Sequence, residues 1–115
     1  MSYDGAVRFL SVAREAIQVK DYERKHIHIG KAQGLLTELL KGLDFEQGGD
    51  VAVSLDTLYR FLYDKLTLAD LRDDASLLGE VASALRDLKQ TWEQAMTEAG
   101  PAAPARAVRE FALSV

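Results

Sequence analysis

The stretch that decides the fold runs from residue 22 to residue 43 and reads YERKHIHIGKAQGLLTELLKGL. Its apolar residues recur at the spacing of an α-helix, which places them on one side of that helix. This inner side consists of Tyr22, Ile29, Ala32, Leu36, Leu39, Leu40 and Leu43. A tight turn at Lys20 and Asp21 precedes the stretch, with Asp21 as the expected N-cap. Gly48 and Gly49 follow it, and we expect helix propagation to stop there.

The same periodicity predicts three further helices. The inner face of the first, which ends near Val19, is Tyr3, Ala6, Leu10, Ala13 and Ile17. We expect Asp50 to cap the third helix, whose inner face is Val51, Leu55, Leu58, Tyr59, Leu62, Leu66 and Ala69. We expect Asp74 to cap the fourth, whose inner face is Leu78, Val81, Leu85, Leu88, Trp92 and Met96.

These elements predict an all-α fold. The only two prolines, Pro101 and Pro104, lie near the C-terminus, so everything before them is free to be helical. Short connections make neighbouring helices antiparallel, which predicts an up-and-down four-helix bundle over residues 1–99. Residues 100–115 form an Ala/Pro-rich tail. In that tail Val108, Phe111 and Val115 suit a short amphipathic segment, either frayed or docked on the bundle.

Composition narrows the class of protein. The chain has 115 residues, 48% of them hydrophobic, and a net charge of −4 with both signs mixed along it. The sequence has no basic patch of the kind that binds nucleic acid. It also has no apolar run long enough to span a membrane and no signal-peptide pattern. The absence of cysteine excludes disulfides, thiolate metal sites and thiol nucleophiles. We therefore expect a cytoplasmic protein.

The sequence offers no catalytic, cofactor or metal site. A di-iron bundle needs two Glu-x-x-His motifs, and only Glu23 with His26 matches. The other histidine, His28, lies two positions away on a different side of a helix and cannot join His26 on one metal. No serine lies in an elbow motif, and the Gly-Gly loop lacks the lysine of a phosphate-binding loop. We therefore expect a protein that is not an enzyme.

The chain carries more apolar residues than one bundle interior needs, since a bundle helix requires roughly a third of its circumference to be apolar. On the first helix, Phe9, Val12 and Ala16 lie off the inner stripe. On the third, Phe61 and Leu68 lie about 120° from it at ~100° per residue. On the second, Leu35 lies on the flank and Ile27 on the far side, beside a furrow formed by Gly30 and Gly34.

Such second stripes, joined into one patch, are typical of a groove that binds another helix. The predicted partner-binding residues are Phe9, Val12, Leu35, Phe61 and Leu68, together with Ile27, Gly30 and Gly34.

Four strings occur in a recognisable order: YDGAVRFL at 3–10, KAQGLLTELLKGLDFEQGG at 31–49, LYRFLYDKL at 58–66 and LRDLKQTWEQA at 85–95. Together they resemble the FliS-type flagellin export chaperones over nearly the whole of residues 3–95. The resemblance implies an antiparallel bundle that holds the disordered C-terminal segment of newly made flagellin in apolar grooves. It also implies protection of flagellin from early polymerisation, delivery to components of the flagellar export gate, and no need for ATP or metal.

Two features depart from that resemblance. Members of the family usually carry a further segment before the Tyr-Asp-Gly run, a strap that lies over the client groove. Here the run begins at Tyr3, as in a natural short variant or a trimmed chain. The tail from Gly100 to Val115 matches nothing in the family pattern, and we expect it to fold back over exposed apolar surface, in cis or onto a neighbour.

Two other classes of protein remain open at this point. One is a homo-oligomeric structural bundle, in which the same stripes bury against another copy. The other is a small enzyme with a site in the bundle core.

Overall fold

A computed structural model describes residues 3–97. Helix α1 spans Tyr3–Gln18, α2 Tyr22–Lys41, α3 Phe45–Arg72 and α4 Ala75–Thr97, and this part of the chain contains no strand. The predicted all-α four-helix bundle is confirmed.

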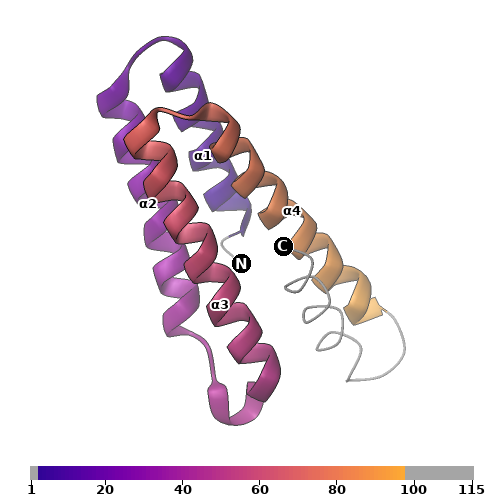
Figure 1. Cartoon of the computed structure of the whole chain (residues 1–115). Coiled ribbons are helices and arrows are strands. Elements are labelled where there is room, and N and C mark those ends of the chain that lie inside the picture. Colours follow the sequence, from indigo (N-terminus) through magenta and orange to yellow (C-terminus); the bar gives the residue numbers. More distant parts are fainter. Residues whose placement is uncertain (1–2, 98–115) are drawn as a thin grey trace.

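The helices form a ring of four in which sequence neighbours are also neighbours in space. Helix α1 packs on α2 and α4, and α3 packs on the same two helices, so α1 and α3 are diagonal (Figure 1). The short turns make each neighbouring pair antiparallel. The outer surface therefore has four seams, each named here by the pair of helices that borders it. The α1/α2 seam and the α3/α4 seam lie on opposite sides of the bundle.

Most of the predicted inner positions are buried. The fully enclosed large side chains come from all four helices and are Leu10, Ile29, Leu36, Tyr59, Leu62, Leu66, Leu78, Val81, Leu85 and Leu88. Three predictions of burial are wrong. Ala16, placed off the stripe, is fully buried, because the side of α1 that carries it packs on α2. Tyr22 is 46% exposed because Lys25 occupies the inner position at that end of α2, and Trp92 is 38% exposed beside a pocket.

The ends of the helices follow from carboxylate caps. The Asp21 carboxylate accepts a hydrogen bond from the Arg24 amide at 3.2 Å, and Asp74 accepts one from the Leu77 amide at 3.1 Å, as predicted. The expected start of the third helix at Asp50 is wrong. Helix α3 begins at Phe45, because Asp44 already caps its first turn through hydrogen bonds from the amides of residues 46 and 47.

At the Gly-Gly pair, where we expected the helix to end, α3 is kinked instead. Gly49 has φ 49° and ψ −124°, a conformation open to glycine, and the chain resumes helical geometry directly after it. The predicted amphipathic segment at Val108, Phe111 and Val115 lies outside the described residues, and so does the side chain of Met96. Within residues 3–97, no helix combines the length and hydrophobicity needed to cross a bilayer.

Candidate functional site

The α1/α2 seam brings together three of the predicted partner-binding residues. Phe9 and Val12 of α1 and Leu35 of α2 are each half-buried. The Phe9 ring lies 6.1 Å from the His28 ring between centroids, and the Lys31 ammonium lies 5.6 Å from the Phe9 centroid. Gly5 leaves room for Leu35, because a Cβ atom at Gly5 would lie 3.4 Å from Leu35 Cδ1. The seam is thus an apolar strip with one edge open to solvent.

The α3/α4 seam holds the other pair. The side of α3 that carries Tyr63 and Thr67 faces α2, because the Gln33 amide donates to the Tyr63 carbonyl and the Thr67 hydroxyl. Phe61 and Leu68 lie on the other flank of α3, which borders α4. Both are half-buried, and the Lys65 ammonium lies 4.9 Å from the Phe61 ring centroid.

The side of α4 that borders this seam is also apolar. Leu77 and Ala84 are half-buried there and recur seven residues apart. Phe61 and Leu68 share the same spacing on α3. Two helical turns separate the members of each pair, so the two pairs form parallel apolar rows along the seam.

The expectation that the off-stripe residues join into one patch is wrong. Phe9, Val12 and Leu35 border one seam, whereas Phe61 and Leu68 border the seam on the opposite side of the ring. The sequence cannot reveal this separation, because it depends on which helices become diagonal. The residues therefore make two apolar strips, and their role in binding stays a prediction.

The glycine furrow on the second helix is open. A Cβ atom added at Gly30 or Gly34 would meet nothing within 4 Å, and both glycines are exposed on the outer surface of α2. Ile27 on the same surface is 46% exposed. Neither glycine is needed for packing within the described bundle. A role for the furrow would therefore require contact with a segment outside the described bundle.

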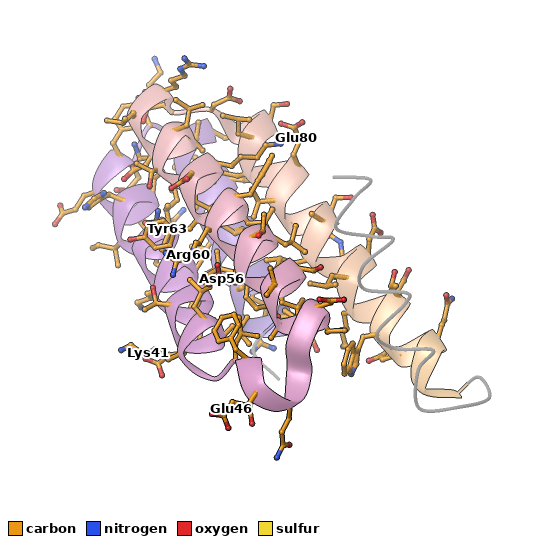
Figure 2. All side chains as sticks on the ribbon, turned by 60° about the horizontal axis from the view of Figure 1, so that its bottom comes forward. Lys41, Glu46, Asp56, Arg60, Tyr63 and Glu80 are labelled. Atoms are coloured by element: carbon orange, nitrogen blue, oxygen red, sulfur yellow. The ribbon has the colours of Figure 1, made fainter. Side chains whose placement is uncertain are left out.

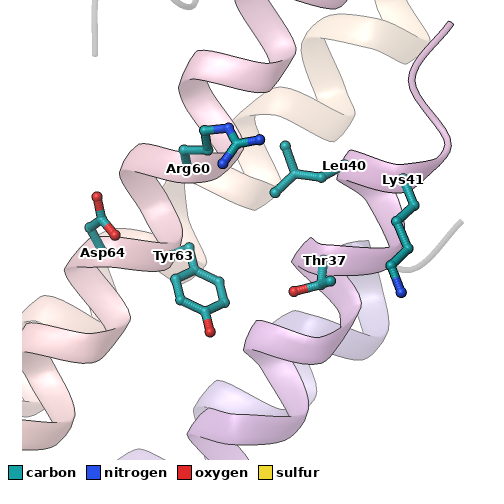
Figure 3. Close-up of a pocket in the computed structure, with 6 residues that line it drawn as sticks. All are labelled: Thr37, Leu40, Lys41, Arg60, Tyr63 and Asp64. Atoms are coloured by element: carbon teal, nitrogen blue, oxygen red, sulfur yellow. The ribbon is translucent and has the colours of Figure 1, made fainter.

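Sequence reasoning missed a pocket between α2 and α3. The pocket has a volume of about 540 Å³, and its residues are Thr37, Leu40, Lys41, Arg60, Tyr63 and Asp64 (Figure 3). Lys41 on α2 and Arg60 and Tyr63 on α3 are on the surface of the bundle, where Arg60 pairs with Asp56 at 3.1 Å (Figure 2). No pattern on either helix marks these residues, since the pocket comes from the register between the two helices.

A second missed pocket, called the end pocket here, lies at the end of the bundle where α1 begins. It has a volume of about 230 Å³ and is mostly apolar; its residues are Tyr3, Glu38, Leu39, Gly42, Leu43, Leu55, Tyr59 and Trp92. At its base the hydroxyls of Tyr3 and Tyr59 share a hydrogen bond. Burial raises the pKa of both phenols, so both stay neutral at ordinary pH.

A polar network joins α2 to the far end of α3. The buried Lys25 ammonium donates to the Asp70 carbonyl at 2.8 Å, to the Asp70 carboxylate at 2.9 Å and to the Asp73 carboxylate. His26 pairs with the other Asp70 oxygen at 2.6 Å and is otherwise exposed, which fits the interpretation of the histidines as surface residues. Among residues 3–97 there is no group of three acidic or histidine side chains placed to hold a metal.

The family model and the similar proteins all indicate the same protein family. The model of the family described as "Flagellar protein FliS" matches residues 1–99. The flagellar secretion chaperone FliSB of Pseudomonas aeruginosa is 38% identical over 89 residues, which cover 77% of this chain and 71% of the relative.

Two further relatives bear the name flagellar secretion chaperone FliS. The protein of Salmonella typhimurium is 36% identical over 95 residues, covering 82% of this chain and 70% of the relative. The protein of Bacillus subtilis is 30% identical over 96 residues, covering 84% and 71% respectively. The similarity thus extends over the described bundle.

Proposed function

Because this chain belongs to the FliS family of flagellar proteins, we propose that it is an export chaperone that binds flagellin. Its client is the disordered C-terminal segment of flagellin, held in the cytoplasm before export. The chaperone acts by occupancy, without catalysis, metal or nucleotide. Covering the apolar face of that segment keeps flagellin from polymerising early and presents it to the export gate.

The observation that carries the proposal is the pair of half-buried apolar seams on opposite sides of the bundle. Phe9, Val12 and Leu35 supply one strip, and Phe61 and Leu68 supply the other. Such strips suit the apolar face of an amphipathic helix. A disordered client loses chain entropy on binding, so it needs a large apolar contact area to bind tightly. Two seams provide more area than one.

The separation of the seams sets a minimum client length. A helical stretch of about 15 residues covers ~22 Å of one seam. Crossing the bundle, whose shorter dimensions are 24 and 22 Å, takes about seven extended residues at ~3.3 Å each. A client that occupies both seams therefore needs roughly 40 residues, and a segment of about 20 residues reaches only one.

The test is calorimetric titration of the chain with the last ~40 residues of flagellin, a length that follows from helix and strand rise. Phe9→Glu and Phe61→Glu should each weaken binding by about 2 kcal/mol, or roughly 30-fold, the scale of an interface hot spot. Leu71→Glu is the matched control, because Leu71 is 79% exposed on the outer side of α3, away from its buried residues. It should leave the affinity unchanged.

Thermal unfolding separates a binding defect from a folding defect. Phe61 is half-buried and outside the core cluster, so Phe61→Glu should leave the bundle folded. If that variant unfolds, the milder Leu68→Asn variant tests the same seam. Equal affinity for all seam variants and the control would refute the proposal. A stable dimer in light scattering that ignores the flagellin segment would favour the homo-oligomeric bundle.

A further inference from the structure

The end pocket is an apolar hollow that the described bundle leaves open. Leu39, Leu43 and Leu55 line it without being fully buried, and Trp92 beside them is 38% exposed. Its volume of about 230 Å³ is below the ~300–1,000 Å³ typical of small-molecule sites, so it suits one or two side chains of a protein segment.

The described helices differ in extent at this end of the bundle. The Asp4 carboxylate pairs with the Lys89 ammonium at 2.7 Å, which fixes the level of the first turn of α1 against α4. Helix α4 continues from Lys89 to Thr97, ~12 Å further at ~1.5 Å per residue. Helix α3 likewise extends past this level, because Tyr59, the partner of Tyr3, lies well inside it. Apolar side chains of α2 and α3 line the pocket beside Tyr3.

The geometry points to the chain's own C-terminal segment, residues 105–115, as the occupant of the end pocket. That segment begins eight positions after Thr97, the last described residue of α4, which lies five positions beyond Trp92. Gly100 and Pro101 are residue types that disfavour a continuous helix, so the sequence allows a reversal of the chain there. The connection from Thr97 to Phe111 spans up to ~45 Å when extended, far more than the few turns back to Trp92 require.

The sequence of that segment fits the pocket in its apolar pattern. Val108, Phe111 and Val115 recur at helical spacing, so a short helix would present all three on one side. The segment also carries Arg106, Arg109 and Glu110. Glu38 of the pocket lies 3.8 Å from Lys41, and Glu93 lies 3.8 Å from Lys89, so apolar contact is the main attraction. Phe111, the only aromatic residue of the segment, is the side chain that we expect inside the pocket.

Cross-linking tests the contact directly, because the natural chain contains no cysteine. The double variant Gly42→Cys with Ala112→Cys keeps Phe111 and the leucines of the pocket, and it should form an intramolecular disulfide under mild oxidation. The control pair Val19→Cys with Ala112→Cys should not, because Val19 lies at the other end of α1. A disulfide between two copies, or equal cross-linking in the control pair, would overturn the inference.

The single tryptophan gives a second measurement on the full chain without cross-links. Trp92 borders the pocket, so docking of the segment shields its indole from solvent. Phe111→Asp should shift Trp92 emission to longer wavelength and increase its quenching by acrylamide. Leu113→Asp should change neither, because a helix would place residue 113 on the side opposite Phe111. Identical spectra for Phe111→Asp and the natural chain would refute the inference. Because no client is present, failure here leaves the flagellin proposal intact.

Discussion

Replacement of Lys25 by methionine should destabilise the bundle more than any change to an exposed ion pair. Lys25 is the single charged residue that is buried within residues 3–97, with its side chain 7% exposed. Its ammonium reaches the Asp70 carbonyl in the last turn of α3, one of the carbonyls that a helix end leaves without an intrahelical partner. It also pairs with the carboxylates of Asp70 and Asp73. The substitution keeps the length of the side chain and removes only the charge and the donors.

The expected loss of stability in Lys25→Met depends on how exposed the two carboxylate partners of Lys25 are. Hydrogen bonds to a charged group contribute ~1.5–3 kcal/mol each, and a buried ion left alone costs more. Asp70 and Asp73 keep access to water, with side chains 21% and 43% exposed, so they can be rehydrated when Lys25 is lost. Methionine also retains the apolar contacts of the stem. We expect the free energy of unfolding to fall by about 2 kcal/mol.

Urea and thermal unfolding measure this loss. With an unfolding entropy of ~2.1 cal/mol/K per residue, a 115-residue chain should lose about 8 °C in melting temperature. Lys41→Met is the matched control, because Lys41 is exposed and lies 3.8 Å from the equally exposed Glu38. That variant should change the free energy of unfolding by less than ~0.5 kcal/mol. Equal losses in the two variants would show that the Lys25 network does not stabilise the fold.

The difference between natural chain and Lys25→Met should also depend on pH. Burial alone would lower the pKa of Lys25, but hydrogen bonds to Asp73 and Asp70 outweigh it and raise that pKa. Burial alone would raise the pKa of Asp70, but hydrogen bonds from Lys25 and His26 outweigh it and lower that pKa. The stabilisation is therefore complete above ~3.9 and below ~10.4, the unfolded values. It is lost as pH falls through the folded pKa of Asp70 or rises through that of Lys25.

Three further predictions concern stability and use the same unfolding assays. Asp74→Ala removes the cap that accepts from the Leu77 amide and should cost about 1 kcal/mol. Gly34→Ala should raise the free energy of unfolding by about 0.5–1 kcal/mol, because the added methyl meets open space inside a helix; a decrease would mean that the furrow is closed in solution. Tyr59→Phe leaves the buried Tyr3 hydroxyl without its partner and should cost about 1 kcal/mol, whereas no loss would contradict a hydrogen bond between them.

Helical periodicity predicted the inner faces well but failed at the ends of the bundle. Leu10, Leu36 and Leu85 are at predicted inner positions and fully buried. Tyr22 and Trp92 belong to the same stripes, yet both are partly exposed. Lys25 takes the inner position beside Tyr22, and α4 continues at Trp92 beyond the level of the first turn of α1. The extent of each neighbour is a property of the assembled bundle.

Local signals predicted the start of α3 too late, at Asp50. Both Asp44 and Asp50 precede apolar helical residues, and each is a reasonable N-cap by type. The helix begins after Asp44, while Gly49 bends it without ending it. A pair of glycines permits a break, and packing of the flanking turns decides whether the helix terminates or only kinks.

The sequence by itself determined the number of helices, their inner stripes, two of their caps and the family, because these depend on residue type and on spacing within one helix. Only the tertiary structure decided that Phe9 and Phe61 lie on opposite sides of the ring, that Lys25 is buried between two carboxylates, and that a hollow opens beside Trp92. Each of these depends on the order and relative level of the helices. Periodicity shows on which side of its own helix a side chain lies. It does not show which other helix packs against that side.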